Sequence, residues 1–124
     1  MALLIAVMFL SVGVLAQQPA EQPKPELAVL KAGIGPCSAD FSVKDADGMP
    51  VYGASVHVKV RYGVFGVKRA DLEVGTNSSG DARIEGLPDK ARPLVYDVQK
   101  AGKKATAEQN VATTCNAKYA LTLK

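Results

Sequence analysis

A 22-letter stretch beginning at Phe41, FSVKDADGMPVYGASVHVKVRY, constrains the fold of this chain more than any other feature. In its second half, Val56 and Val58 are apolar while the neighbouring His57 and Lys59 are polar. Successive side chains of a β-strand point to opposite faces, so this period of two predicts a strand with one face in a core and one in water. The turn-forming letters DADG separate it from an earlier alternating stretch. The pattern predicts two strands joined by a tight turn.

Similar alternation recurs along the rest of the chain, interrupted by Gly, Pro, Asn and Asp. Helical periodicity is absent after the N-terminal apolar run. The sequence therefore predicts an all-β fold, a seven-stranded, antiparallel-dominated β-sandwich. The expected strands cover residues 39–44, 54–62, 70–76, 82–85, 94–100, 106–111 and 118–124. Residues 27–34 fit either a short edge strand or an ordered lead-in.

The first residues have the composition of an export signal. Residues 2–15, ALLIAVMFLSVGVL, are apolar or small and carry no charge. The run is shorter than the roughly 20 apolar residues of a membrane span, and Val14 and Ala16 are small residues at the positions that a signal peptidase reads. We expect a signal peptide at residues 1–16, cleaved after Ala16. No Lys or Arg precedes the run, so an uncleaved anchor or a misassigned start is the alternative.

The domain organisation follows from this signal. The next segment, QQPAEQPKPE, is rich in proline, which is typical of an extended spacer. We expect a spacer at residues 17–36 and one β-sandwich domain at residues 37–124. The protein is then secreted or periplasmic, and it contacts the membrane only through the leader before cleavage.

The two cysteines, Cys37 and Cys115, have a structural interpretation. An even number of cysteines in an oxidising compartment favours a disulfide. Each lies just before an expected strand, so the sulfurs meet if the first and last strands are parallel neighbours. Closing a loop of roughly 80 residues then contributes about 4.5 kcal/mol in the chain-entropy model. A redox or metal pair is disfavoured because CxxC is absent and the chain has one histidine.

Four segments together resemble the carboxypeptidase regulatory-like domain: DADGMPVYGASVHV, TNSSGDARIEGLP, PLVYDVQKAGKKA and KYALTLK. The likeness covers about residues 40–124. It implies a prealbumin-like (transthyretin-like) sandwich, related to the Cna B-type repeats and to folds that bind carbohydrate, in an exported bacterial protein. The matching letters are turn and core residues, so the resemblance is specific for fold and nearly silent on activity.

The net charge and the residue types present argue against several classes of function. The formal net charge is +3 and no run of five or six like charges occurs, which argues against nucleic acid as a partner. His57 stands alone on a wet strand face, so we expect no catalytic residue, metal site or cofactor. We expect a non-enzymatic module for binding, adhesion or scaffolding at the cell envelope, with a protein or glycan partner. A carbohydrate-binding module is the alternative, and an uncharacterised hydrolase is a weaker third.

Two surface features are candidate interaction sites. One is a basic stripe that includes Lys44, and the other is the apolar, Gly-flanked run VFGV. A solvated sheet face is the commoner role of such a stripe, and the run folds back over the sandwich unless it projects into water. Two of the candidate residues, Tyr52 and Phe65, are the only aromatic side chains available as a sugar platform. The full candidate surface is Tyr52, His57, Lys59, Arg61, Phe65, Lys68 and Arg69.

Overall fold

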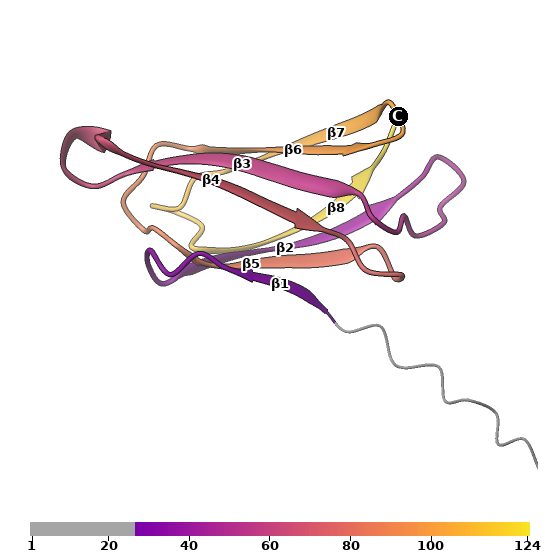
Figure 1. Cartoon of the computed structure of the whole chain (residues 1–124), viewed down its shortest axis with the longest axis horizontal. Coiled ribbons are helices and arrows are strands. Elements are labelled where there is room, and N and C mark those ends of the chain that lie inside the picture. The colour runs from indigo at the N-terminus through magenta and orange to yellow at the C-terminus, as the bar shows by residue number, and fades with distance from the viewer. Residues whose placement is uncertain (1–26) are drawn as a thin grey trace, which may run out of the picture.

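The structure is a computed structural model that describes residues 27–124. Its elements are β1 (Ala28–Lys31), β2 (Cys37–Lys44), β3 (Ser55–Tyr62), the 3-10 turn η1 (Val64–Gly66), β4 (Lys68–Gly75), β5 (Asp81–Leu87), β6 (Leu94–Lys100), β7 (Lys103–Gln109) and β8 (Asn116–Thr122). Two four-stranded sheets pack face to face (Figure 1), with strand orders β1-β5-β2-β8 and β4-β3-β6-β7. The predicted all-β sandwich is confirmed. Within this part of the chain, no helix has the length and apolar character needed to cross a bilayer.

The predicted strand number was wrong, because the described chain has eight strands. The additional strand is β1, which runs parallel to β5 with Ala28 opposite Ala82 and Lys31 opposite Glu85. Its four residues extend the sandwich into the range 17–36 that we assigned to the spacer. The sequence left this segment open because four residues give too short an alternation to separate a strand from a lead-in. The expected signal peptide and residues 17–26 lie outside the described residues.

The core lies between the two sheets and is built from the residues of one parity in each strand. In β3, Val56, Val58 and Val60 are buried while the polar residues between them face outward. Aromatic rings join the sheets, since the ring centroids of Phe41 and Tyr96 lie 4.7 Å apart in an edge-to-face arrangement. Such pairs contribute beyond the area they bury, so they help to fix the spacing of the sheets.

Two predicted turns form with side-chain support. Oδ1 of Asp45 accepts hydrogen bonds from the backbone N–H groups of Asp47 and Met49. Oδ1 of Asn77 does the same for residues Ser79 and Asp81. These contacts are typical of turns and place the strands on either side in register.

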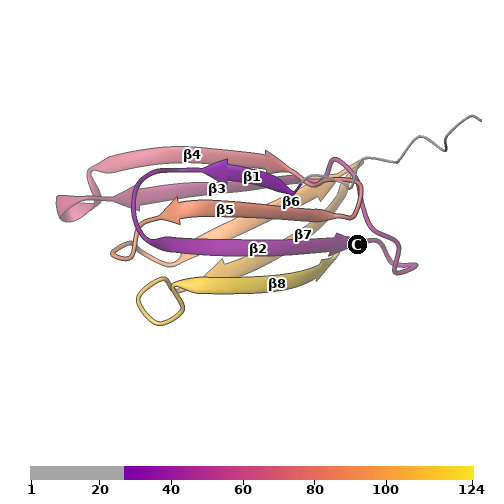
Figure 2. The ribbon, with the colours of Figure 1, turned by 90° about the horizontal axis from the view of Figure 1, so that it is seen from below.

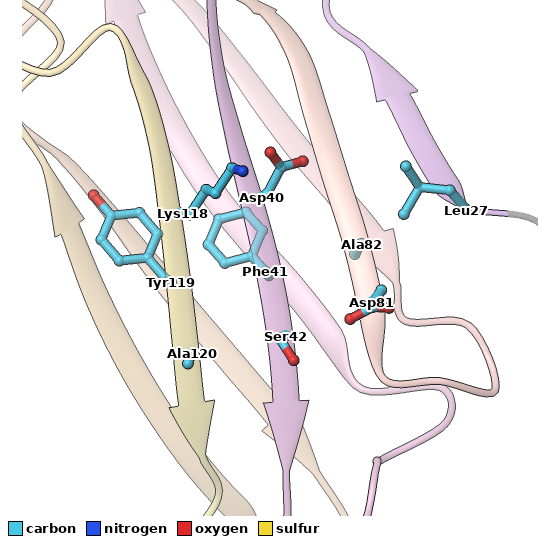
Figure 3. A pocket seen from close by; sticks show the side chains of 9 residues that line it. All are labelled: Leu27, Asp40, Phe41, Ser42, Asp81, Ala82, Lys118, Tyr119 and Ala120. Carbon is cyan, nitrogen blue, oxygen red and sulfur yellow. The ribbon is translucent and has the colours of Figure 1, made fainter.

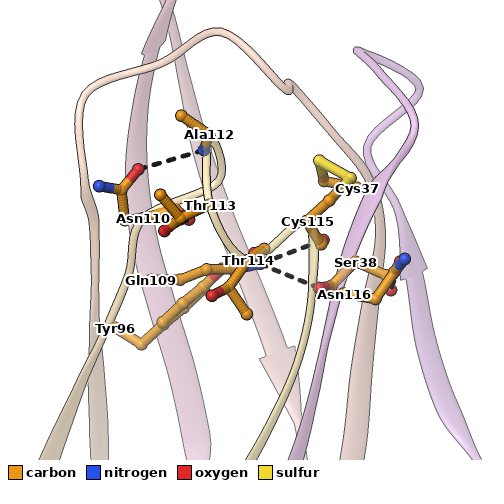
Figure 4. Close-up of a disulfide and its surroundings, with 10 residues drawn as sticks. All are labelled: Cys37, Ser38, Tyr96, Gln109, Asn110, Ala112, Thr113, Thr114, Cys115 and Asn116. Atoms are coloured by element: carbon orange, nitrogen blue, oxygen red, sulfur yellow. Dashed lines mark hydrogen bonds between the residues drawn. A yellow bond between two sulfur atoms is a disulfide. The ribbon is translucent and has the colours of Figure 1, made fainter.

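The predicted disulfide between Cys37 and Cys115 is present. It forms because β2 and β8 are parallel neighbours, with Ser38 opposite Asn116, which brings the starts of both strands together. Beside it lies the buried amide of Gln109, shown in Figure 4. Its Nε2 donates to the backbone carbonyls of Thr114 and Cys115, at 2.8 and 3.2 Å. The segment that carries the second cysteine is therefore fixed by hydrogen bonds as well as by the covalent link.

Candidate functional site

The β3–β4 hairpin extends beyond the neighbouring strands at one end of the sandwich (Figures 1 and 2). Its tip contains η1, and three apolar side chains there are exposed to water: Val64 (73%), Phe65 (96%) and Val67 (73%). The alternative in which the tip folds back over the sandwich is therefore wrong. We call Val64, Phe65 and Val67 the apolar tip.

Phe65 has an uncommon backbone conformation. Its φ is 59°, in the left-handed region, between the glycines Gly63 (φ 82°) and Gly66 (φ 64°). Glycine adopts such angles without steric cost, whereas a bulky L-residue loses roughly 1 kcal/mol or more. Phe65 therefore has two unfavourable features, a strained backbone and an apolar ring exposed to water. Strain of this kind often accompanies a binding surface.

Basic side chains surround the base of the apolar tip. Arg61 lies directly opposite Arg69 in the β3–β4 pairing, and Lys68 lies opposite Tyr62. Lys90 and Arg92, from the loop between β5 and β6, join Arg61 and Phe65 around a hollow of about 490 Å³. The remaining lining residues of that hollow are Tyr62, Gly63, Gly66 and Ala91. We call the five exposed cations Arg61, Lys68, Arg69, Lys90 and Arg92 the basic end.

The basic end carries its charge without ion-pair partners in the described part of the chain. None of the three ion pairs found between residues 27 and 124 includes one of its five members. No carboxylate lines the hollow, although Asp89 precedes Lys90 in the same loop. Like charges directly opposite in an antiparallel pair are destabilising, so Arg61 and Arg69 face each other at a cost.

Arg83, on the outer face of the other sheet, shows the contrasting arrangement. Its Nε lies 2.7 Å from Glu85 Oε1, and its Nη1 lies 2.9 Å from both carboxylate oxygens of Asp40. Hydrogen bonds to Glu85 first, and to Asp40 next, raise the pKa of the Arg83 guanidinium. The chain thus neutralises this arginine internally, as is usual for structural charges, while it leaves the basic end uncompensated.

The predicted basic stripe is divided by the structure. Residues His57, Lys59 and Arg61 do share the outer face of β3. However, Lys59 lies opposite Asp71, and Nε2 of His57 is 4.0 Å from the Asp71 carboxylate. Arg61 alone among the three joins the basic end. Lys44 belongs to β2 in the other sheet, so it is not part of the stripe.

The two aromatic candidates lie at opposite ends of β3. Tyr52 is exposed (69%) in the loop before this strand, whereas Phe65 follows it at the tip. The two rings therefore cannot form one sugar platform. Lys90 and Arg92, which lie in another loop, were not among the predicted site residues. Their place beside Arg61 depends on the pairing of β3 with β6, which brings residues 88–93 next to the end of β3. Only a prediction of that pairing would have identified them.

A second hollow, of about 440 Å³, lies on the outer face of the first sheet (Figure 3). The small side chains of Ser42 and Ala120 lie opposite each other there, and Asp81 lies opposite Ser42 on the other side. Leu27 and Lys118 also line it. Of its charged residues, Asp40 is already paired with Arg83, and Asp81 and Lys118 have opposite charges. This hollow therefore has mixed charge, whereas the basic end has cations only.

The described residues offer little for catalysis or metal binding. Between residues 27 and 124, no group of three or more His, Cys, Asp or Glu side chains is arranged to hold a metal ion. The contact between His57 and Asp71 brings an imidazole near a carboxylate, but both side chains are open to water, at 33% and 73%. A catalytic base normally has an oriented partner within hydrogen-bond reach, which this pair does not provide.

The comparisons with known proteins give structural neighbours only. No family model matches the chain, and no curated protein sequence matches it. A 3-chlorocatechol 1,2-dioxygenase from Rhodococcus opacus 1CP matches with a TM-score of 0.46 and 16% identity, over 86% of this chain and 69% of that one. A catechol 1,2-dioxygenase from Acinetobacter sp. ADP1, inhibited by bound mercury, matches with a TM-score of 0.47 and 13% identity, over 85% and 54%.

These neighbours correct our functional expectation. Both are enzymes, and the expectation of a non-enzymatic module for binding, adhesion or scaffolding at the envelope does not agree with them. At 16% and 13% identity, the likeness assigns neither a reaction nor a substrate to this chain.

Proposed function

We propose that the protein binds an anionic, phosphate-bearing ligand through the basic end. The observation that carries the proposal is the cross-strand pair of Arg61 and Arg69, beside a hollow that Arg61 lines together with Lys90 and Arg92 from another loop. Binding of this kind is compatible with a chain that is an enzyme or with one that is not.

Electrostatics support the proposal. The guanidinium groups of Arg61 and Arg92 present planar donor forks that match phosphate oxygens, whereas Lys90 supplies a mobile point charge. Positive charges held close together repel one another, and an anion placed between them relieves that repulsion. A concave site lined by one sign of charge also raises the local concentration of counter-ions. The hollow is concave, and its charged lining residues are all positive.

The test is an NMR titration with inositol hexakisphosphate, a soluble phosphate-rich anion. We expect amide shifts confined to residues 61–69 and 88–93, with an affinity that falls as salt is added, because surface charges are screened. The control region is the opposite end of the sandwich, around residues 45–53. Shifts spread evenly over the basic residues of the whole surface, or no saturable shift, would contradict the proposal.

Two further assignments rest on the sequence. We propose that the domain is related to carboxypeptidase regulatory-like domains, which is supported by turns at Asp45 and Asn77 within the matching segments. We also propose that the protein is exported to a secreted or periplasmic location. The link between Cys37 and Cys115 supports this, because disulfides persist in oxidising compartments.

A further inference from the structure

We infer that the phosphate groups recognised by the basic end belong to an anionic lipid bilayer, into whose surface the apolar tip inserts. The inference rests on the proposed anion binding and names its partner. It departs from our expectation that only the leader contacts a membrane.

The first support is the shape of the apolar tip. A ligand pocket is concave and buries apolar side chains around a small molecule. Here the β3–β4 hairpin extends beyond the neighbouring strands (Figure 2), and Val64, Phe65 and Val67 lie between these two strands with Phe65 96% exposed. A protruding apolar cluster gains most by entering a soft apolar phase, and the headgroup–acyl boundary of a bilayer is such a phase.

The second support is the position of the charges relative to the tip. Arg61, Lys68 and Arg69 lie on the strands that lead into and out of the tip, and Lys90 and Arg92 lie on the adjacent loop. When the tip enters a membrane, all five approach the plane of the lipid phosphates. Each Lys or Arg near an anionic surface strengthens binding about fivefold. Apolar and basic side chains thus favour the same orientation of the sandwich.

The backbone conformation of the apolar tip limits how deeply the tip can enter the bilayer. Gly66 N–H donates to Gly63 O at 3.1 Å, and Val67 N–H donates weakly to Val64 O at 3.5 Å. Irregular backbone is not tolerated in the hydrocarbon core, because groups without partners there cannot reach water. We therefore place the three side chains at the headgroup–acyl boundary and the turn backbone among hydrated headgroups. The protein is anchored to one leaflet by this tip.

The test uses a local fluorophore, because the chain contains no tryptophan. In the full chain, Phe65→Trp reports on the tip and Tyr52→Trp reports on an exposed ring at the opposite end. Each is mixed with vesicles of phosphatidylcholine alone and of phosphatidylcholine with phosphatidylglycerol. The apolar residues 2–15 can attach either variant to vesicles, so local emission decides the result rather than attachment. We expect a blue shift for Phe65→Trp with the anionic vesicles and none for Tyr52→Trp.

Charge variants complete the test. Adding Arg61→Gln and Arg69→Gln to the Phe65→Trp chain should weaken the emission response about fivefold for each charge removed. Unchanged tip emission on anionic vesicles, or an equal response to neutral vesicles, overturns the inference. Inositol hexakisphosphate shifts without any emission response would uphold anion binding and overturn only the bilayer as partner. Absence of both would overturn both proposals.

Discussion

Arg61 lies directly opposite Arg69 in the antiparallel pairing of β3 and β4, so two guanidinium groups face each other on an exposed sheet surface. The next pair on the same face of these strands, Lys59 and Asp71, has opposite charges. On the outer face of the hairpin, a cation is therefore paired with an anion far from the tip, whereas two cations are opposite each other near the tip. This change marks where the protein gives up stability for binding.

Arg69→Glu should stabilise the fold and weaken anion binding. The substitution converts a like-charge pair into an opposite-charge pair, which is worth about 0.5 kcal/mol on an exposed sheet face. Urea unfolding measures the first effect and the titration with inositol hexakisphosphate measures the second. Arg69→Gln is the matched control and should be intermediate in both. A variant that is less stable yet binds equally well would contradict the role of this pair.

Phe65→Gly should leave the fold intact. Glycine relieves the left-handed strain at this position, while its greater freedom in the unfolded chain offsets part of the gain. We expect the free energy of unfolding to change by less than about 1 kcal/mol. Phe41→Ala is the contrasting variant, because it removes a buried ring and should cost about 3 to 5 kcal/mol. A comparable loss for Phe65→Gly would show that the tip is part of the core.

The architecture was largely predictable, because alternating residues define a strand wherever one face is buried. The disulfide between Cys37 and Cys115 was predicted on the condition that the first and last expected strands are parallel neighbours, and the structure has both the disulfide and that pairing. Boundaries were less predictable. Strand β7 begins at Lys103 rather than near 106, because Ala101 and Gly102 both take positive φ and turn the chain in two residues. No apolar alternation marks Lys103 and Lys104 as strand residues.

The candidate site was predictable only in part. Arg61, Phe65, Lys68 and Arg69 are close in sequence, so local pattern placed them on one hairpin. Lys90 and Arg92 depend on the pairing of β3 with β6, which is a long-range contact. Single-sequence periodicity carries no information about which strands become neighbours. The pairing of Lys59 with the opposite charge of Asp71 could not be predicted either, because it depends on the register between two strands.

Reduction of the Cys37–Cys115 disulfide should lower stability by about 2 to 4 kcal/mol, since the unfolded chain gains freedom when a long loop opens. Thermal melting with and without reductant measures this effect. The double variant Cys37→Ala and Cys115→Ser is the control, because its melting should not respond to reductant. Anion binding should survive reduction at temperatures where the protein stays folded. Unchanged melting after complete reduction would refute a stabilising role.

Alkaline conditions should destabilise the protein through Tyr96. Burial, followed by the neighbouring Tyr119, raises the pKa of Tyr96. The unfolded chain releases this proton near pH 10 and the folded chain keeps it. Stability is therefore complete below about pH 10 and falls as the pH rises toward the folded pKa. Urea unfolding at about pH 8 and about pH 10.5 measures the loss.

Tyr96→Phe is the variant that checks this origin. It should flatten the alkaline loss, and at neutral pH it should cost about 1 to 3 kcal/mol. The cost arises because Oε1 of Gln109 loses the hydroxyl that donates to it at 2.6 Å. Tyr52→Phe, at an exposed site, is the matched control. An alkaline loss that persists unchanged in Tyr96→Phe would assign it to another group.

The most direct test of the account compares two triple variants with the same change in net charge. One replaces Arg61, Lys90 and Arg92 by Gln at the basic end, and the other replaces Lys44, Lys100 and Lys103 at the opposite end. The measurement is the dissociation constant for inositol hexakisphosphate at one salt concentration. We predict that the first variant binds at least about tenfold more weakly, since it loses charge-assisted contacts, while the second stays close to the unmodified protein. Equal weakening in both would show that net charge alone attracts the anion and would contradict a binding site at the basic end.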